Sequence, residues 1–89
     1  MRAVVTVIGK DRTGIIARVS GYLADNDINI LDISQTIMQD IFTMIMLVDT
    51  GKSEKSIGDI NEKFEKLGEE LGVEIRIQHQ GIFNSMHRI

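Results

Sequence analysis

Residues 2–30 read RAVVTVIGKDRTGIIARVSGYLADNDINI: an apolar run, a glycine-containing break and an amphipathic segment in immediate succession. Residues 2–8 are rich in β-branched side chains, which predicts a strand with neighbours on both sides. The apolar residues after the break recur at helical spacing and predict a helix with one buried face: Ile15, Ile16, Val19 and Leu23. A strand that leads directly into a helix indicates a mixed α and β fold.

The break at residues 9–14, GKDRTG, supplies the end of the strand and the start of the helix. Asp11 or Thr13 can cap the helix by accepting a hydrogen bond from its first N–H groups. The same N–H groups, with the helix dipole, can instead receive a carboxylate or another anion. The residues alone favour the capped turn, because such loops are common wherever helices begin.

Small residues line a second side of this helix, and we expect another helix or strand to pack closely there: Ala17, Ser20, Gly21 and Ala24. The turn-forming residues 25–27 then lead into a predicted strand, Ile28 to Met38. Its apolar and polar side chains alternate. After a short turn, residues 41–48 are apolar on both faces, which predicts a central strand.

The second helix has the clearest pattern in the chain. Its apolar residues step by three and four without interruption: Ile57, Ile60, Phe64, Leu67 and Leu71. Ser56 and Asp59 have the spacing of a capping box, and Gly72 stands where a C-terminal cap is expected. Residues 73–78 alternate apolar and polar, which predicts an edge strand with one buried face.

Strand, helix, strand, strand, helix and strand in this order predict an α+β, ferredoxin-like βαββαβ fold. We expect a four-stranded antiparallel sheet with both helices on one face and a short helical tail. The single domain spans residues 1–89, with a core of about 1–79 and a C-terminal extension of about 80–89. The central strands are apolar on the opposite face as well, so the tail, another subunit or both must cover it.

The composition narrows the possible functions. The 89 residues include no cysteine and carry a net charge of −3. The absence of cysteine excludes disulfides and thiolate chemistry and fits the cytoplasm, the expected location. No segment is long and apolar enough for a membrane helix. The acidic balance and the lack of exposed aromatic pairs argue against nucleic acid.

No catalytic or metal-binding group is recognisable in the sequence. His79 and His87 are the only histidines and have no obvious third ligand, so we expect no metal site and no cofactor. The serines lack a histidine at a recognisable distance, which leaves a hydrolase triad without support. We therefore expect that the protein is not an enzyme.

Residues 9–34, GKDRTGIIARVSGYLADNDINILDIS, resemble the opening of an ACT domain, the small-molecule-binding regulatory module found on many enzymes of amino-acid metabolism. The resemblance covers an apolar strand, the motif Asp-Arg-x-Gly-Ile-Ile, a helix, and Asn29-Ile30 at the start of the next strand. The element order matches nearly the whole chain, as in stand-alone ACT proteins with a short C-terminal extension.

The resemblance implies that the first loop of one domain and the second strand of a neighbouring domain hold an amino acid between them. The implied ligand-binding residues are Asp11, Arg12, Thr13, Gly14, Ile15, Asn29 and Ile30. Thr13 replaces a frequent proline of the family, and Gly9 stands where some ligand-binding members carry a side chain. Asp11 has two readings of equal weight, a partner for the ligand ammonium or a helix cap.

Our leading hypothesis is a regulatory module that acts as a homo-oligomer, joined through the exposed edge strand Ile28 to Met38, and binds a small molecule such as an amino acid. The first alternative is a protein-protein interaction module that uses the apolar sheet face and the tail. The second is a small ferredoxin-like enzyme, which lacks a visible catalytic constellation.

Overall fold

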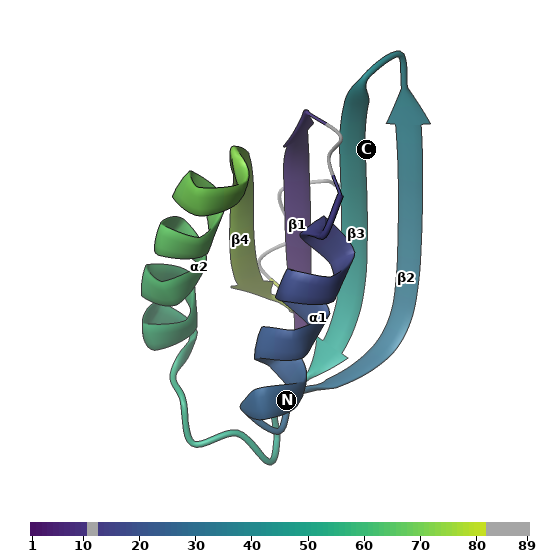
Figure 1. Ribbon diagram of the computed structural model, residues 1–89. Helices are drawn as coiled ribbons and strands as arrows, with labels where there is room; N and C mark the ends of the chain where they lie inside the picture. Colours follow the sequence, from purple (N-terminus) through teal and green to yellow (C-terminus); the bar gives the residue numbers. More distant parts are fainter. Residues whose placement is uncertain (11–12, 82–89) are drawn as a thin grey trace.

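The computed structural model describes residues 1–10 and 13–81 and contains four strands and two helices (Figure 1). They follow the predicted order: β1 (Arg2–Lys10), α1 (Ile15–Asp25), β2 (Asn29–Met38), β3 (Ile41–Asp49), α2 (Ile57–Leu71) and β4 (Val73–His79). The predicted elements are confirmed within one or two residues at most boundaries. Residues 82–89 of the predicted C-terminal extension, about 80–89, lie outside the described residues.

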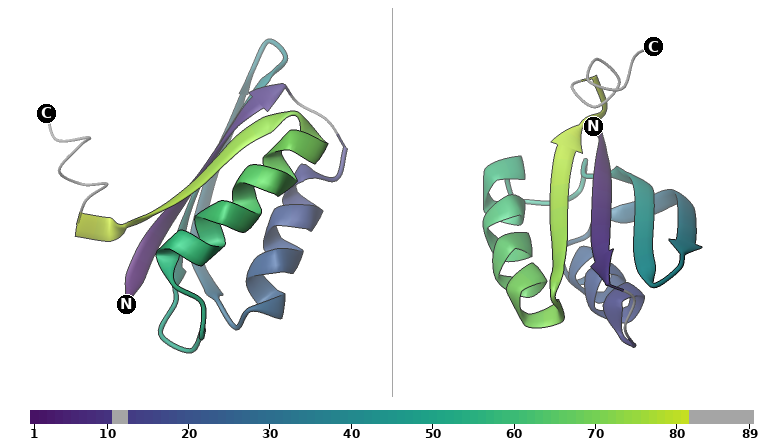
Figure 2. Two further views of the ribbon diagram at one scale, coloured as in Figure 1. Left: turned by 90° about the vertical axis from the view of Figure 1, so that its left-hand side faces the viewer. Right: turned by 90° about the horizontal axis from the view of Figure 1, so that it is seen from above.

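The four strands form one antiparallel sheet in the order β2-β3-β1-β4. Both helices cover the same face, as Figure 2 shows from the side and from above. The prediction that β1 has neighbours on both sides is confirmed, because it pairs with β3 and with β4. Strands β2 and β4 form the two edges, also as predicted.

The core lies between the sheet and the two helices. Val5 of β1 is paired with Met46 of β3 on one side and with Ile77 of β4 on the other, and all three are fully buried. Phe64 of α2 is equally buried and meets the ring of Tyr22 edge to face, with 5.2 Å between the ring centroids. This contact joins the two helices above the sheet.

The ends of α2 form as the sequence predicts. The Asp59 backbone N–H donates to the Ser56 hydroxyl oxygen at 3.1 Å, and the Ser56 N–H donates to the Asp59 carboxylate at 3.4 Å. These two bonds complete the capping box. At the other end, Gly72 has a φ of 72°, and its N–H donates to the carbonyl of Gly68.

Helix α1 begins differently from the prediction. Its N-cap residue is Gly14, which makes no side-chain capping bond, so the expected cap from Thr13 is wrong. The expected cap from Asp11 lies outside the described residues. The predicted close packing on the small residues is also wrong among the described residues, since a Cβ added to Gly21 would meet nothing within 4 Å.

Helix α2 closes the free edge of β4. The Asn61 side-chain amide donates to the carbonyl of Ile77 at 2.9 Å, and its oxygen accepts the Ile77 N–H at 2.8 Å. This pair of bonds imitates a neighbouring strand. About two helical turns further along, Gly68 lies so close to the strand that an added Cβ would collide with the carbonyl oxygen of Val73.

The loop after β3 holds the start of the chain. The Met1 carbonyl accepts the Thr50 N–H at 2.9 Å, and the Met1 ammonium lies 3.3 Å from an oxygen of the Asp49 carboxylate. That same oxygen accepts the Gly51 N–H at 2.9 Å. The Gly51 hydrogen bond, and after it the bond and charge of the ammonium, lower the pKa of Asp49 below its usual 3.8.

We predict that the two helix-interior glycines respond oppositely to alanine. Gly68→Ala should lower the free energy of unfolding by about 1–3 kcal/mol, because the new methyl group collides with backbone of β4. Gly21→Ala is the matched control, and it should raise that energy by about 0.5–1 kcal/mol, because its surroundings are open. Urea unfolding of both variants checks this. Equal effects would contradict the close approach of α2 to β4.

A second prediction concerns acid. Because the folded pKa of Asp49 is lowered, its contribution to stability is present above the unfolded value of 3.8 and is lost as the pH falls through the folded value. Acidification from neutral pH to values below 3.8 should therefore lower the melting temperature of Asp49→Asn less than that of the parent protein. Thermal unfolding of both proteins across this pH range measures the difference. If the two melting temperatures fall in parallel as the pH is lowered, Asp49 makes no such contribution to stability.

Candidate functional site

The candidate site begins where β1 passes into α1. Gly14 has a φ of 93°, a left-handed conformation that glycine adopts without strain. Its carbonyl accepts the Arg18 N–H at 2.9 Å and so opens the helix. No acidic residue lies in the first turn of α1, and no side chain of the N-cap residue caps it. Among the described residues, no acidic group in the first turn offsets the positive end of the helix dipole, which favours an anion. Asp11, the alternative cap, lies outside the described residues.

The predicted residues of the first loop have different positions. Thr13 is exposed and Gly14 is half-buried, so both are accessible to a ligand. Ile15 is 2% exposed and belongs to the core, which leaves only its backbone for ligand contact. Asp11 and Arg12 lie outside the described residues.

The other predicted residues, Asn29 and Ile30, lie at the opposite end of the sheet. Asn29 pairs with Asp49, whereas Lys10 at the start of the first loop pairs with Ile41. These two positions on β3 are its first and last residues, about 26 Å apart at the usual rise per residue. A single chain therefore does not bring the two halves of the predicted site together.

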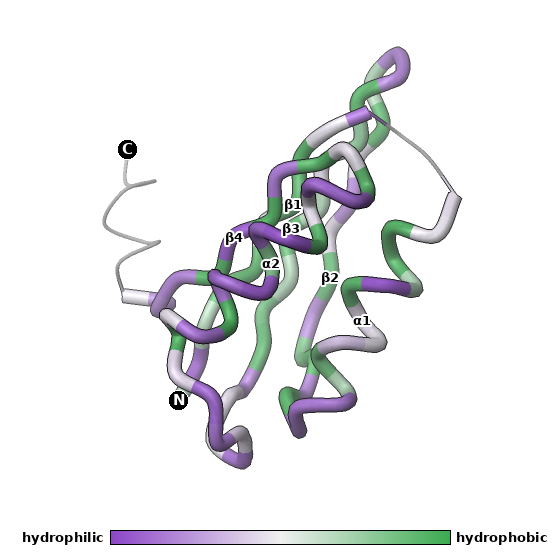
Figure 3. Tube along the Cα trace, turned by 60° about the vertical axis from the view of Figure 1, so that its left-hand side comes forward, coloured by the Kyte–Doolittle hydropathy of each residue, from purple (hydrophilic) through white to green (hydrophobic). Residues whose placement is uncertain are grey.

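Strand β2 is an uncovered edge. Every residue from 31 to 38 is exposed, and Ile37 and Met38 reach 54% and 70%. Neither helix stands in front of this strand in Figure 1, and the β2–β3 hairpin extends past the helices. Figure 3 shows hydrophobic positions close to the hydrophilic tip of the hairpin. A long exposed edge with apolar side chains invites pairing with another strand.

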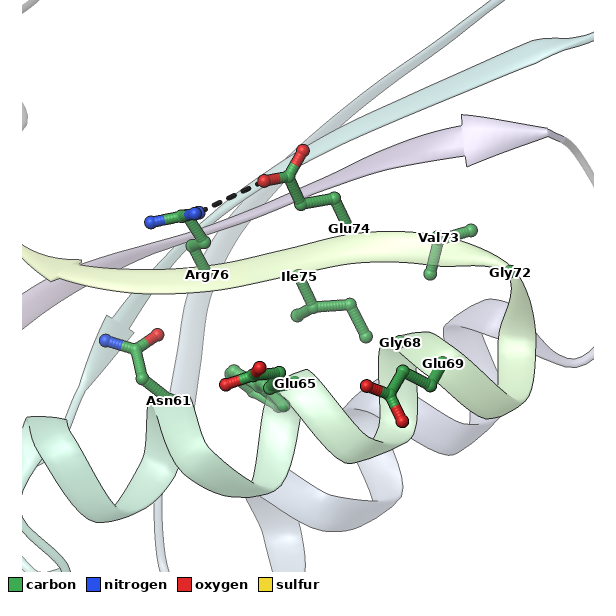
Figure 4. Close-up of a pocket in the computed structure, with 10 residues that line it drawn as sticks. Asn61, Glu65, Gly68, Glu69, Gly72, Val73, Glu74, Ile75 and Arg76 are labelled. Carbon is green, nitrogen blue, oxygen red and sulfur yellow. Dashed lines mark hydrogen bonds and ion pairs between the residues drawn. The ribbon is translucent and has the colours of Figure 1, made fainter.

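The structure also has a groove that the sequence did not predict, between α2 and β4 (Figure 4). It has a volume of about 610 Å³. Glu65 and Glu69 line its helix side, and Glu74 and Arg76 on the strand form an exposed ion pair at 3.3 Å. The groove follows the line where Gly68 lets α2 approach the strand, and a glycine within an amphipathic helix was its only sequence signal.

Two further observations concern metals and membranes. In residues 1–10 and 13–81, no group of three or more His, Asp or Glu side chains is placed to hold a metal ion. Neither helix of the described chain has the length and apolar character needed to span a bilayer.

Comparison with known proteins identifies the family. The ACT domain family model matches residues 2–78. A UPF0237 protein of Clostridium acetobutylicum is 57% identical over the full length of both chains. This relative therefore also spans the residues that follow the end of the family model.

Solved structures agree with this match. An ACT domain protein from Streptococcus pneumoniae has a TM-score of 0.81 and 42% identity, with 93% of each chain covered. A formyltetrahydrofolate deformylase from Pseudomonas syringae pv. tomato has a TM-score of 0.80 and 26% identity. The similarity covers 88% of the present chain but 27% of the deformylase. The sequence match, the strand order and these structures agree, and the chain belongs to the ACT domain family.

Proposed function

We propose that the protein is a regulatory module that pairs with a second copy through β2 and binds an amino acid at the seam. The observation that carries this proposal is the separation of the two half-sites. The first loop and Asn29 lie at opposite ends of one sheet, and an uncovered edge runs between them. A second copy is needed to complete the site.

Antiparallel pairing of two β2 strands would bring Asn29 of one copy toward the first loop of the other. In such a pair, Asn29 of one copy lies beside Met38 of the other. Met38 pairs with Ile41, which pairs with Lys10 at the start of the first loop. Each Asn29 thus approaches the first loop of the neighbouring copy, and a two-fold axis produces two equal sites.

The chemistry of this seam suits an amino acid. The N–H groups at the start of α1 can receive the carboxylate, and Gly14 leaves them accessible because it has no side chain. The amide of Asn29 can donate to and accept from the ligand. Asp11 either pairs with the ammonium group or caps the helix, and both roles stay open.

The opposite edge supports the choice of β2 as the interface. Asn61 already occupies the N–H and carbonyl of Ile77, and α2 lies against β4 at Gly68. A partner strand cannot pair along β4 without displacing the helix. Strand β2 has no such cover among the described residues, since all of its central side chains are exposed.

We predict that the protein is a dimer and that charge on β2 separates it. Ile33→Lys with Ile37→Lys places like charges on both sides of the seam, and both side chains are already exposed, so the fold should survive. Light scattering after size-exclusion chromatography should give half the parent mass. Glu62→Lys on the exposed side of α2 is the control and should stay dimeric. If the parent protein itself has the mass of a monomer, pairing through β2 is rejected.

We also predict that calorimetry with the twenty amino acids detects at least one ligand, at one molecule per subunit. Asn29→Ala should weaken binding about tenfold, the effect of losing one hydrogen bond of about 1.4 kcal/mol. Gln35→Ala alters the middle of the same strand and is the control; it should bind the amino acid as tightly as the parent does. If the dimer forms and no amino acid binds, ligand sensing is rejected while the assembly stands.

A further inference from the structure

The groove between α2 and β4 contains one residue of unpaired strand edge. The N–H and carbonyl of Ile77 point away from β1, because both are bonded to the Asn61 amide. Hydrogen-bonding groups along an antiparallel strand point to alternate sides, so those of Ile75 and Val73 point the same way. The Val73 carbonyl lies against Gly68. The N–H and carbonyl of Ile75 have no hydrogen-bond partner among the described residues.

These two groups of Ile75 open into the groove. Ile75 is 4% exposed, and its nitrogen lies 3.8 Å from the place where a Cβ on Gly68 would stand. Polar backbone groups that are buried without a partner cost free energy, which a ligand can recover by bonding to them. The open edge is one residue long, because Asn61 occupies its neighbour on one side and Gly68 contacts its neighbour on the other. This space suits a single head group and is too short for a strand.

The side chains of the groove give it a negative charge. Glu65 and Glu69 line it from α2, and both are exposed. Figure 4 shows the two carboxylates on the helix, beneath the strand. Neither forms an ion pair or hydrogen bond within the part of the chain that the structure describes. The lysines of α2 do not line the groove, and its one lining cation, Arg76, is paired with Glu74 at 3.3 Å.

Both carboxylates are placed against the local electrostatics of the helix. Glu65 and Glu69 are four residues apart, a spacing at which like charges repel. Glu69 also lies in the last turn of α2, which contains no basic residue and where the helix dipole is negative. Glu70 in the same turn is compensated by Arg18, at 2.6 Å. A cation in the groove would remove both conflicts that Glu69 experiences.

We propose that this groove binds a guanidinium group carried on a short apolar chain. The planar group can donate to the Ile75 carbonyl and to the carboxylates of Glu65 and Glu69. An ammonium group fits less well, because it is more strongly hydrated and lacks the flat array of donors. The apolar side chains of Val73 and Ile75 line the groove beside it. Its volume of about 610 Å³ falls within the usual range of roughly 300–1,000 Å³ for small-ligand sites.

The experiment is an ¹⁵N NMR titration of the full-length chain with agmatine at constant ionic strength. Agmatine has a guanidinium group and no carboxylate, so it does not imitate an amino acid at the proposed seam. The amide signals of Ile75, Glu65 and Glu69 should shift progressively, whereas those of Gly14 and Asn29 should not. Tetramethylammonium, a cation without N–H donors, should shift none of them. If agmatine leaves the groove signals unchanged, or if both cations shift them equally, the proposal is overturned.

Two variants test the carboxylates. Glu65→Gln with Glu69→Gln should weaken agmatine binding by about tenfold or more, because two charge-assisted hydrogen bonds are lost. Both side chains are exposed, so the fold should survive, and the signals of the sheet residues verify this. Glu62→Gln is the matched control, exposed on the same helix but outside the groove, and should bind as the parent does. Unchanged affinity in the double variant would contradict the proposal.

A second probe distinguishes the possible sources of the guanidinium group. A tripeptide with an arginine between two alanines and with blocked ends presents the same group as a protein side chain. Shifts of the Ile75 signal with agmatine alone assign the site to a small molecule, and shifts with the peptide alone assign it to a partner protein. Shifts with neither reject the site. The outcome is independent of the seam, since β4 and β2 are opposite edges of the sheet.

Discussion

Strand β1 pairs with β3 on one side and with β4 on the other, and within the described part of the chain no other strand joins the two halves of the sheet. Its helix-side residues are fully buried, so each half of the core is packed against it. The pairing with β4 continues as far as Gly9, where an added Cβ would lie 2.7–2.9 Å from atoms of Val73. Gly9 therefore has a structural role directly beside the loop that leads to the candidate site.

This role of Gly9 connects the fold to the site. Some ligand-binding ACT domains carry a side chain at this position, and its absence here follows from the close approach of β4 rather than from the needs of a ligand. The proposed site therefore uses backbone N–H groups of α1 and residues from the neighbouring copy. In that proposal binding and assembly are linked, because a ligand that binds only the pair stabilises the pair.

The periodic elements were predictable from the sequence because local patterns determine them. The capping box at Ser56, the left-handed Gly72 and the alternation of β4 all depend on nearby residues. The start of α1 was less predictable: Asp11 and Thr13 offered side-chain caps, whereas the N-cap is Gly14 in a left-handed conformation that no neighbouring residue signals. A register shift between Ile30 and Asp32 moves Leu31 out of the predicted alternation. The groove beside Gly68 was missed because a glycine in a helix does not reveal which backbone lies against it.

The asymmetry between the two sheet edges limits how many copies can join. A domain with two free edges could add neighbours indefinitely and grow into a fibril of stacked strands. Here the amide of Asn61 and the backbone of α2 terminate the sheet at β4. In the proposed dimer, pairing through β2 uses the only strand edge that is still uncovered among the described residues, so strand pairing would end at a closed pair rather than continue into a polymer.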